Sequence, residues 1–226
     1  MIDLIVLAGG FGNRIKSVSK GIPKGLLPVD RGVFLDKIFN KIIKFKVRDI
    51  YLSLHYKPEL FEKYLKDLPE SNRITTVIEP EPLGTGGALN YIIENSSISS
   101  PFFVINGDTL TNINLDELAI NFNKSNYDAM IGISFVENTQ RYGSVKFNNN
   151  CLIEFIEKEG DTPGWINNGY YIINKKVFDK LSGRFSIEQD IFPILANQRR
   201  MGIFSVEKDD FIDIGIPEDY KKLLGE

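Results

Sequence analysis

The sequence predicts an α/β fold with a mixed, mainly parallel sheet, and three observations support this prediction. Short apolar runs alternate with helical patterns through the first half of the chain, as in parallel βαβ units. A glycine-rich loop directly follows the first apolar run, at residues 2–7. The second half has closely spaced strand patterns with few helices between them, which favours antiparallel pairing there.

Apolar periodicity predicts the individual elements. In the first half, strands are expected at 4–7, 49–54, 74–78 and 102–105, and helices at 34–45, 58–68, 88–93 and 115–122. In the second half, strands are expected at 129–136, 143–147, 152–156 and 170–173, and helices at 175–181, 188–197 and 217–224. Asn114 is expected to cap the helix that begins after it. The 226 residues are expected to form one domain, with a nucleotide-binding half at about 1–125 and a second-substrate half at about 126–226.

Composition limits the function classes. The chain carries 27 Lys and Arg against 30 Asp and Glu, so its net charge of −3 gives no broad attraction to nucleic acid. Cys151 and His55 are the only cysteine and histidine, which excludes an intrachain disulfide and disfavours Cys- or His-based metal sites and Ser-His-Asp triads. The opening apolar stretch has no basic segment before it, and no stretch reaches the ~20 apolar residues of a membrane span. We therefore expect a cytoplasmic protein with no membrane partner.

Residues 7–14 read Leu-Ala-Gly-Gly-Phe-Gly-Asn-Arg, a strand end followed by a glycine-rich loop and a cation. The glycines allow the backbone to approach a ligand with its N–H groups turned inward, and the guanidinium of Arg14 matches phosphate oxygens. A P-loop is excluded because the chain has no Gly-Lys pair, and a dinucleotide fingerprint needs a third glycine at an immediate helix. The pattern predicts a phosphate site, to which Lys24, held between Pro23 and Pro28, adds a second cation.

Glu79 precedes a second glycine-rich stretch, residues 83–87. Such a loop can seat a flat base because no side chain covers its face. A carboxylate accepts hydrogen bonds only, so Glu79 would suit guanine, whose pairing edge offers adjacent N1–H and N2–H donors. Uracil and thymine offer N3–H alone at that edge. The alternative, an exposed glutamate at the rim of the site, is equally open.

Two aspartates are candidate ligands for Mg²⁺. Asp108 follows a glycine at the end of the strand expected at 102–105, and Asp213 stands between apolar residues before Gly215. Mg²⁺ takes one or two carboxylates together with oxygens of a substrate phosphate. Two such aspartates, far apart in sequence, could meet at one ion. The alternative for each is an ordinary turn aspartate.

A third group of polar residues lies in the second half of the chain. Glu157 and Asn167 offer a carboxylate and an amide for sugar hydroxyls, and Lys158 offers an ammonium group for a phosphate. Gly143 is small enough for a sugar ring to approach the backbone. The alternative for each of these side chains is a plain surface position.

Together these segments resemble the sugar-nucleotide pyrophosphorylases, nucleotidyltransferases that join a nucleoside triphosphate to a sugar 1-phosphate. The family pattern Gly-Gly-x-Gly-Thr/Ser-Arg is similar to residues 9–14, with Asn13 at the Thr/Ser position. Further family segments are similar, in order, to residues 23–25, 79–87, 107–108, 155–158, 167–171 and 213–219. The match therefore extends over nearly the whole chain.

The resemblance implies a Rossmann-like, three-layer nucleotidyltransferase fold with Mg²⁺ as cofactor. It implies catalytic roles for Arg14, Lys24 and Asp108, and metal binding by Asp108 and Asp213. It implies sugar-phosphate binding by Gly143, Glu157, Lys158 and Asn167. It implies nucleotide binding by Leu7, Ala8, Gly9, Gly10, Gly12, Asn13, Glu79, Leu83, Gly84, Thr85, Gly87, Asn106 and Gly107.

Within this family the sequence is most similar to guanylyltransferases that act on D-glycero-α-D-manno-heptose 1-phosphate. The expected substrates are GTP and this sugar phosphate, and the expected product is GDP-heptose for a surface polysaccharide or S-layer glycan. We expect a monomer or a homodimer. The alternatives are a mannose 1-phosphate guanylyltransferase, a uridylyl- or cytidylyltransferase, and a non-catalytic protein that binds a sugar nucleotide.

Overall fold

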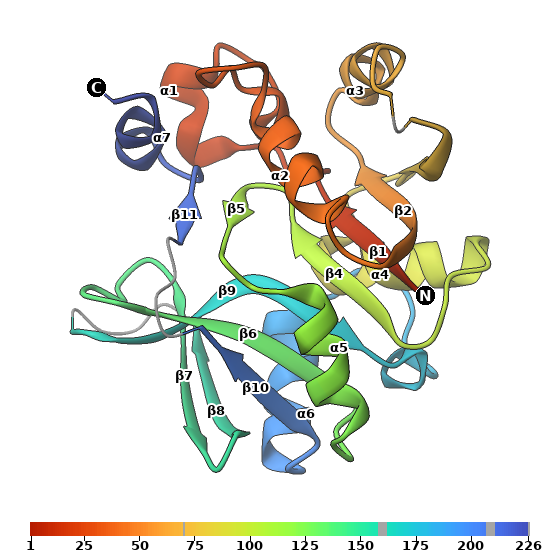
Figure 1. Cartoon of the computed structure of the whole chain (residues 1–226), viewed down its shortest axis with the longest axis vertical. Helices are drawn as coiled ribbons and strands as arrows, with labels where there is room; N and C mark the ends of the chain where they lie inside the picture. The colour runs from red at the N-terminus through yellow and green to blue at the C-terminus, as the bar shows by residue number, and fades with distance from the viewer. Residues whose placement is uncertain (70, 158–161, 207–210, 226) are drawn as a thin grey trace.

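The computed structural model describes residues 1–69, 71–157, 162–206 and 211–225, and it confirms the α/β class. Within these residues a nine-stranded sheet has the order β3-β2-β1-β4-β9-β6-β10-β8-β7, and β11 pairs with β5 in a second sheet (Figure 1). The strands are β1 Ile2–Leu7, β2 Val47–Leu54, β3 Ile74–Ile78, β4 Phe102–Asn106, β5 Thr109–Leu110, β6 Ala129–Val136, β7 Gly143–Asn148, β8 Cys151–Glu157, β9 Gly164–Ile173, β10 Met201–Ser205 and β11 Ile212–Asp213. The helices are α1 Lys16–Ser19, α2 Phe34–Ile42, α3 Pro58–Leu65, α4 Gly84–Asn95, α5 Leu115–Asn123, α6 Phe192–Asn197 and α7 Pro217–Leu224.

β1 lies at the centre of the parallel half of the sheet. Its residues Leu4, Ile5 and Val6 have no exposed surface, because helices cover both faces of the strand. β1 pairs in parallel with β2 and β4, and β2 pairs in parallel with β3. The carboxyl ends of these four strands therefore lie along one edge. The glycine-rich loop, His55, Glu79 and Asp108 all follow a strand at this edge.

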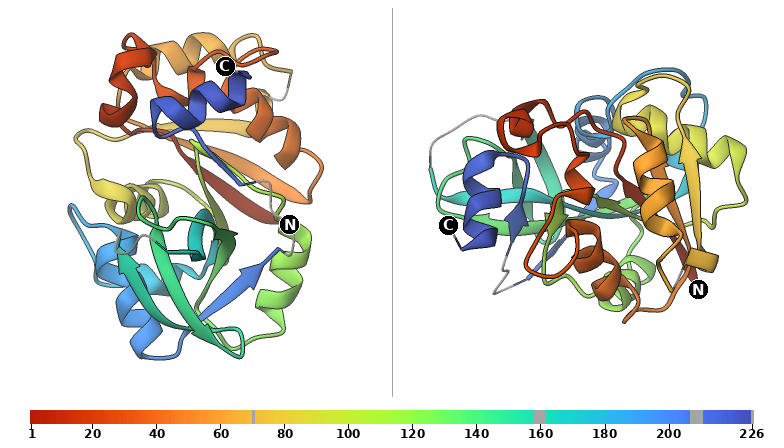
Figure 2. Two further views of the ribbon diagram at one scale, coloured as in Figure 1. Left: turned by 90° about the vertical axis from the view of Figure 1, so that its left-hand side faces the viewer. Right: turned by 90° about the horizontal axis from the view of Figure 1, so that it is seen from above.

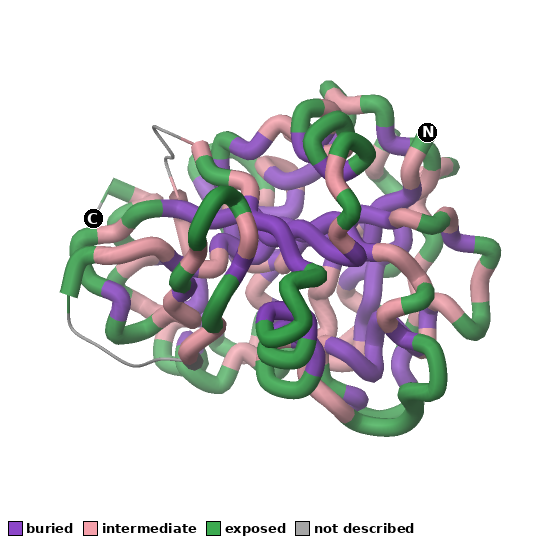
Figure 3. The backbone as a smooth tube through the Cα atoms, turned by 90° about the horizontal axis from the view of Figure 1, so that it is seen from below, coloured by how far each residue is buried: buried purple, intermediate pink, exposed green. Residues whose placement is uncertain are grey.

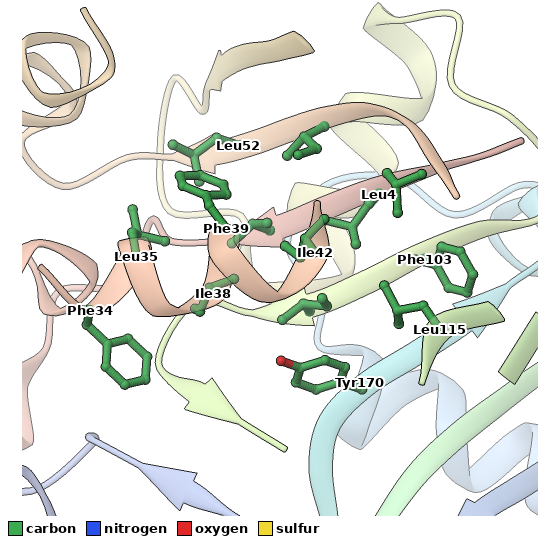
Figure 4. Packing of buried hydrophobic residues seen from close by; sticks show 14 of the residues in the cluster. Leu4, Phe34, Leu35, Ile38, Phe39, Ile42, Leu52, Phe103, Leu115 and Tyr170 are labelled. Carbon is green, nitrogen blue, oxygen red and sulfur yellow. The ribbon is translucent and has the colours of Figure 1, made fainter. Parts of the chain in front are cut away.

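Alternate strand residues contribute to two separate cores, which gives the predicted three layers. Leu4 belongs to a core that includes residues of α2, α3, α5 and α7, whereas Ile5 belongs to a core with α4 and α6. Figure 4 shows Leu35, Phe39 and Ile42 of α2 against the strands. The helices lie outside the sheet in both views of Figure 2, and burial in Figure 3 is greatest along the central strands.

The antiparallel strands lie in the second half, as predicted. β8 and β9 run against their neighbours, whereas the other strands of the large sheet share one direction. Two differences appear: β9 begins at Gly164 rather than residue 170, and β10 has no counterpart among the predicted strands. The sequence did not predict β10 because Gly202 interrupts its apolar pattern. The structure explains why a glycine is needed at this position. A Cβ atom there would lie 2.5 Å from the ring of Tyr127.

Two expected helices are wrong in form. The helix expected at 175–181 is a 3₁₀ turn at Lys175–Phe178, and Lys180, two residues after this turn, has a left-handed φ of 68°. The helix expected at 188–197 begins as a π-helical turn at Ile187–Ile191 before α6. Tertiary contacts outweigh apolar periodicity in such short segments. In the part of the chain that the structure describes, no helix is long and apolar enough to cross a bilayer.

Asn114 caps α5, as the sequence predicts. Its Oδ1 accepts hydrogen bonds from the N–H groups of Asp116 (3.0 Å) and Glu117 (3.2 Å). Asn114→Ala should therefore lower the free energy of unfolding by about 1 kcal/mol in urea titrations, because these two donors lose their acceptor. The control is Asn121→Ala in the same helix, which should be neutral or slightly stabilising, since alanine has the higher helix propensity. Equal losses in the two variants would contradict the capping role.

Candidate functional site

A cavity of about 360 Å³ opens at the carboxyl edge of the parallel strands. The glycine-rich loop, the ends of β2, β3 and β4, and the first turn of α4 all contribute to its wall. Eight of the nucleotide or catalytic residues predicted from the sequence line it: Leu7, Gly9, Gly10, Glu79, Gly84, Thr85, Asn106 and Asp108. Sequence segments about 100 residues apart thus meet at one site.

Glu79 is part of the cavity wall and is only 8% exposed, so the alternative of an exposed rim residue is wrong. Its Oε1 accepts a hydrogen bond from the hydroxyl of Ser53 (3.0 Å), and its Oε2 accepts one from the N–H of Leu83 (3.2 Å). These bonds fix the carboxylate and leave it further acceptor capacity, because two carboxylate oxygens have about four lone-pair sites. The carboxylate is thus oriented to receive donors from a ligand.

The glycines at the start of α4 are explained by close packing against segment 183–187, whereas the sequence predicted that they make room for a flat base. A Cβ atom on Gly84 would lie 2.6 Å from the carbonyl oxygen of Phe185, and one on Gly87 would lie 2.5 Å from that of Gly183. The Phe185 carbonyl accepts hydrogen bonds from the N–H groups of Gly86 (3.0 Å) and Gly87 (3.1 Å). Segment 183–187 therefore caps α4 and fills the space that we expected a base to occupy beside Gly86 and Gly87. Gly84 alone of these glycines also lines the cavity.

The predicted catalytic side chains meet at the other side of the glycine-rich loop. Lys24 Nζ lies 2.6 Å from Asp108 Oδ2, and both side chains are largely shielded from solvent. A Cβ atom on Gly215 would lie 3.4 Å from Arg14 Nη2 and 2.7 Å from Asp213 Oδ1, so these two side chains flank one backbone position. Two cations and two carboxylates therefore form a single cluster.

Asp213 joins this cluster through a short strand pairing. β11 pairs in antiparallel with β5, with Asp213 opposite Thr109, and the N–H of Ile214 donates to the carbonyl of Asp108 (3.0 Å). The pairing brings together two aspartates that are 105 positions apart, Asp213 in β11 and Asp108 directly before β5. Figure 1 shows β11 and β5 apart from the large sheet, on the side of the molecule where α7 lies beside α1.

The proximity of the two carboxylates changes the titration of Asp213. Burial, followed by the negative charge of Asp108, raises the pKa of this carboxyl to about 6. The N–H of Gly215, which donates to Asp213 Oδ1 at 2.6 Å, and the charges of Lys24 and Arg14 act in the opposite direction. Two adjacent carboxylates with a destabilised anionic form are a common feature of functional sites.

The other residues predicted to bind the nucleotide lie between the cavity and the charged cluster, next to Lys24 and Asp108. Gly12 has a left-handed φ of 62°, and a Cβ atom there would lie 3.2 Å from the Lys24 side chain. Asn13 opens a 3₁₀ turn that also contains Arg14. Ala8 and Gly107 line a small hollow of about 60 Å³ together with Lys24 and Asp108. Each of these positions was predicted from the sequence.

None of the described residues that were predicted to bind the sugar phosphate lines the cavity of about 360 Å³. Asn167 donates through Nδ2 to the hydroxyl of buried Tyr171 (2.8 Å) and accepts from the N–H of Gly169 (2.9 Å). A Cβ atom on Gly143 would lie 2.6 Å from the ring of Phe155, which explains a glycine there by packing. Gly143 pairs with Glu157 across β7 and β8. The side chain of Glu157 and the whole of Lys158 lie outside the described residues.

Sequence reasoning missed six residues of the cavity wall: Phe11, Ser53, His55, Pro82, Ala88 and Arg184. Ser53 and His55 lie at the end of β2, so the rule that ligands bind at the carboxyl ends of parallel strands was a usable signal for them. Arg184 had no such signal, because segment 183–187 reaches the cavity only through its docking on α4. Glu188, next to this segment, accepts a hydrogen bond from Thr85 Oγ1 (2.5 Å).

The comparison with protein families agrees with this geometry. The model of the family described as nucleotidyl transferase matches residues 4–224. The chain belongs to the nucleotidyl transferase family. The nucleotidyltransferase is 35% identical over 227 residues to D-glycero-alpha-D-manno-heptose 1-phosphate guanylyltransferase of Campylobacter jejuni, with 99% of each chain covered.

Two further proteins show how widely the similarity of this nucleotidyltransferase extends. The crystal structure of HddC from Yersinia pseudotuberculosis complexed with GMP-PN matches with a TM-score of 0.84 and 35% identity, covering 100% of this chain and 99% of that one. Mannose-1-phosphate guanyltransferase of Schizosaccharomyces pombe is 32% identical over 224 residues, 96% of this chain and 61% of that protein. The predicted nucleotidyltransferase fold is confirmed.

The raised pKa of Asp213 predicts a stability effect. The folded protein binds the Asp213 proton more tightly than the unfolded chain, whose aspartate has a pKa near 3.9. The contribution of Asp213 to the free energy of unfolding therefore falls as pH rises from about 4 to about 6, and it stays low above that range. Without divalent metal, Asp213→Asn should be more stable than the parent at pH 7.5. Its free energy of unfolding in urea titrations should be higher by on the order of 1–3 kcal/mol. The difference should shrink towards pH 4.

The matched control is Asp179→Asn at an exposed position, which should leave the parent's stability nearly unchanged at both pH values. A loss of stability in Asp213→Asn at pH 7.5 would show that the Arg14 and Lys24 charges outweigh burial and the Asp108 charge.

Proposed function

We propose that this nucleotidyltransferase transfers GMP from GTP to D-glycero-alpha-D-manno-heptose 1-phosphate and releases pyrophosphate. One observation carries the proposal: a single cavity is lined both by the buried carboxylate of Glu79 and by Asp108 of the charged cluster. Glu79 follows β3 and Asp108 follows β4, three strand positions away, which is roughly 14 Å. An extended nucleoside triphosphate is suited to that span.

The base would bind at the Glu79 end. Guanine presents adjacent N1–H and N2–H groups at its pairing edge, and a carboxylate held by Ser53 and Leu83 can accept both. A site built to accept hydrogen bonds discriminates strongly against a base that lacks the donors. The Yersinia pseudotuberculosis structure, whose complex contains GMP-PN, supports the guanine assignment.

Mg²⁺ would be held by Asp108 and Asp213. The donor set fits this ion, because Mg²⁺ prefers oxygen ligands and takes one or two carboxylates plus substrate phosphate oxygens. The described residues contain no cluster of three or more His, Cys, Asp or Glu side chains that could enclose a metal on their own. When bound, Mg²⁺ would neutralise charge on the triphosphate and on the two carboxylates.

The chain's own residues would align the reaction and stabilise its charge. An oxygen of the sugar 1-phosphate attacks the α-phosphorus of GTP, a new P–O bond forms, and the bond to the α–β bridging oxygen breaks as pyrophosphate leaves. The nucleophile is already an anion, so no protein base is required. Arg14 and Lys24 would bind phosphate oxygens, and the N–H groups of residues 9–12 would surround the triphosphate. Such catalysis depends on positioning and charge compensation.

The sugar phosphate would bind on the side of β7, β8 and β9. Gly143, Glu157, Lys158 and Asn167 are the proposed contacts, and Arg184 adds an exposed guanidinium at the cavity wall. The Campylobacter jejuni relative, covered over 99% of its length, supports heptose 1-phosphate as the acceptor. Mannose 1-phosphate is the second candidate, and the Schizosaccharomyces pombe relative supports it. The nucleotide-activated sugar would enter surface glycan synthesis in the cytoplasm.

A substrate panel tests the proposed reaction. Pyrophosphate release should be greatest with GTP, Mg²⁺ and D-glycero-α-D-manno-heptose 1-phosphate among GTP, ATP, UTP and CTP combined with heptose, mannose and glucose 1-phosphates. A clear preference for UTP or CTP would contradict the role of Glu79. No release with any pair would favour a non-catalytic protein that binds a sugar nucleotide.

The two aspartates can be tested by isosteric amides. Asp108→Asn and Asp213→Asn should each lower kcat by at least about 100-fold with unchanged circular dichroism, because a neutral amide cannot compensate Mg²⁺. Asp179→Asn, at an exposed position, is the control and should retain kcat within about twofold. Near-normal turnover in either active-site variant would remove that residue from the metal site.

A further inference from the structure

Phe11 places an exposed aromatic ring in the middle of the glycine-rich loop. Its side chain is 45% exposed, although its atoms line the cavity. The ring contacts that of His55 edge to face, with centroids 5.5 Å apart and planes at 76°, and contacts that of Tyr56 at 5.6 Å. A single exposed phenylalanine is ordinary on a protein surface. A phenylalanine braced by two rings in a cavity wall is a preformed apolar surface at a ligand site.

The ring of His55 is fixed in turn by the segment that carries the base-reading carboxylate. His55 Nδ1 lies 3.1 Å from the carbonyl oxygen of Glu79, and because a carbonyl only accepts, Nδ1 donates this hydrogen bond. Phe11 and Glu79 are thus linked through one intervening side chain. Their relative position is set by the fold and not by a flexible loop.

The loop backbone also runs close to the Glu79 carboxylate. A Cβ atom on Gly9 would lie 3.1 Å from Glu79 Oε1, and the carbonyl of Gly9 accepts a hydrogen bond from the N–H of Tyr56 (3.3 Å). A Cβ atom on Gly10 would meet no atom within 4 Å, so the loop borders open space directly before Phe11. A flat ring whose edge meets Glu79 therefore has free room beside an aromatic surface.

We propose that Phe11 is the stacking surface for the nucleobase and that it favours a purine. The inference rests on the proposed nucleotidyl transfer and adds to it the residue that binds the face of the base, whereas Glu79 binds its edge. Stacking on an aromatic side chain raises affinity without reading hydrogen bonds, and a purine offers a larger face than a pyrimidine. Edge and face recognition would then come from two different strand ends.

The test compares Phe11→Ala, Phe11→Leu and Phe11→Tyr by steady-state kinetics. Phe11→Ala should raise the KM for the nucleotide about tenfold, with kcat and the KM for the sugar phosphate within about twofold of the parent. Phe11→Tyr should keep the parental KM, whereas Phe11→Leu should resemble Phe11→Ala, because it restores apolar bulk without a π face. Full rescue by leucine, or an unchanged nucleotide KM in Phe11→Ala, would overturn the proposal.

Phe135→Ala is the matched control. Phe135 is 51% exposed and also makes an edge-to-face contact, with Trp165 at 5.7 Å, but it does not line the cavity. Its removal should leave the nucleotide KM unchanged. A comparable rise in this variant would show that the Phe11 effect is a general consequence of losing a surface ring.

A binding measurement separates this inference from the proposed reaction. The kinetic series uses whichever nucleoside triphosphate is the best substrate. A preference for ATP refutes the guanine assignment without deciding the role of Phe11, whereas a preference for UTP or CTP contradicts the purine preference proposed here. Phe11→Trp emission should change on titration with that nucleotide in the absence of sugar phosphate, beyond the change from Trp165 in the parent. If the parent binds a nucleotide by calorimetry and the added emission does not respond, Phe11 is not a stacking surface. If the parent binds no nucleotide, both proposals fail.

Discussion

The pairing of two short strands, β11 and β5, is the contact on which the charged cluster depends. It sets Asp213 opposite Thr109, one residue after Asp108, and a hydrogen bond from Ile214 to the Asp108 carbonyl (3.0 Å) extends it. α7 follows β11 and is held to the opposite part of the chain, because the hydroxyl of Tyr220 donates to the carbonyl of Pro28 (2.6 Å). Asp213 therefore completes a charged cluster whose other members, Arg14, Lys24 and Asp108, come from the first 110 residues.

The charged cluster lowers the stability of the folded protein, because it holds the Asp213 carboxylate beside that of Asp108. The proposed chemistry explains why such an arrangement is present. A buried aspartate beside a second carboxylate destabilises its own anionic form, and the raised pKa of Asp213 reflects this. Lys24 and Arg14 offset only part of the cost. Under the proposed function, a divalent cation held by the two carboxylates would add the positive charge that compensates them. At the other end of the cavity, Glu79 needs no such compensation, because hydroxyl and N–H donors hold it.

The sequence predicted those parts of the fold and site that depend on local patterns. Buried strands such as β1 have continuous apolar runs, Asn114 has the side chain of a helix cap, and glycine-rich loops after strands mark the ligand edge. It failed where distant segments decide the outcome. The π-helical turn at Ile187–Ile191, the docking of segment 183–187 on Gly84–Gly87 and the arrival of Arg184 at the cavity all depend on contacts between segments about 100 residues apart. Glu79 could not be assigned to rim or wall without the packing of Ser53 and Leu83.

The proposed function requires a nucleotide to lie in the cavity at the carboxyl edge of the sheet, with its base at Glu79 and a divalent metal at Asp108 and Asp213. The most direct measurement is a crystal structure with a non-hydrolysable GTP analogue and Mn²⁺, whose anomalous scattering locates the metal. We expect an anomalous peak within coordination distance of both carboxylates and of the triphosphate, with the guanine edge at Glu79. A metal bound elsewhere, or a base turned away from Glu79, would contradict it.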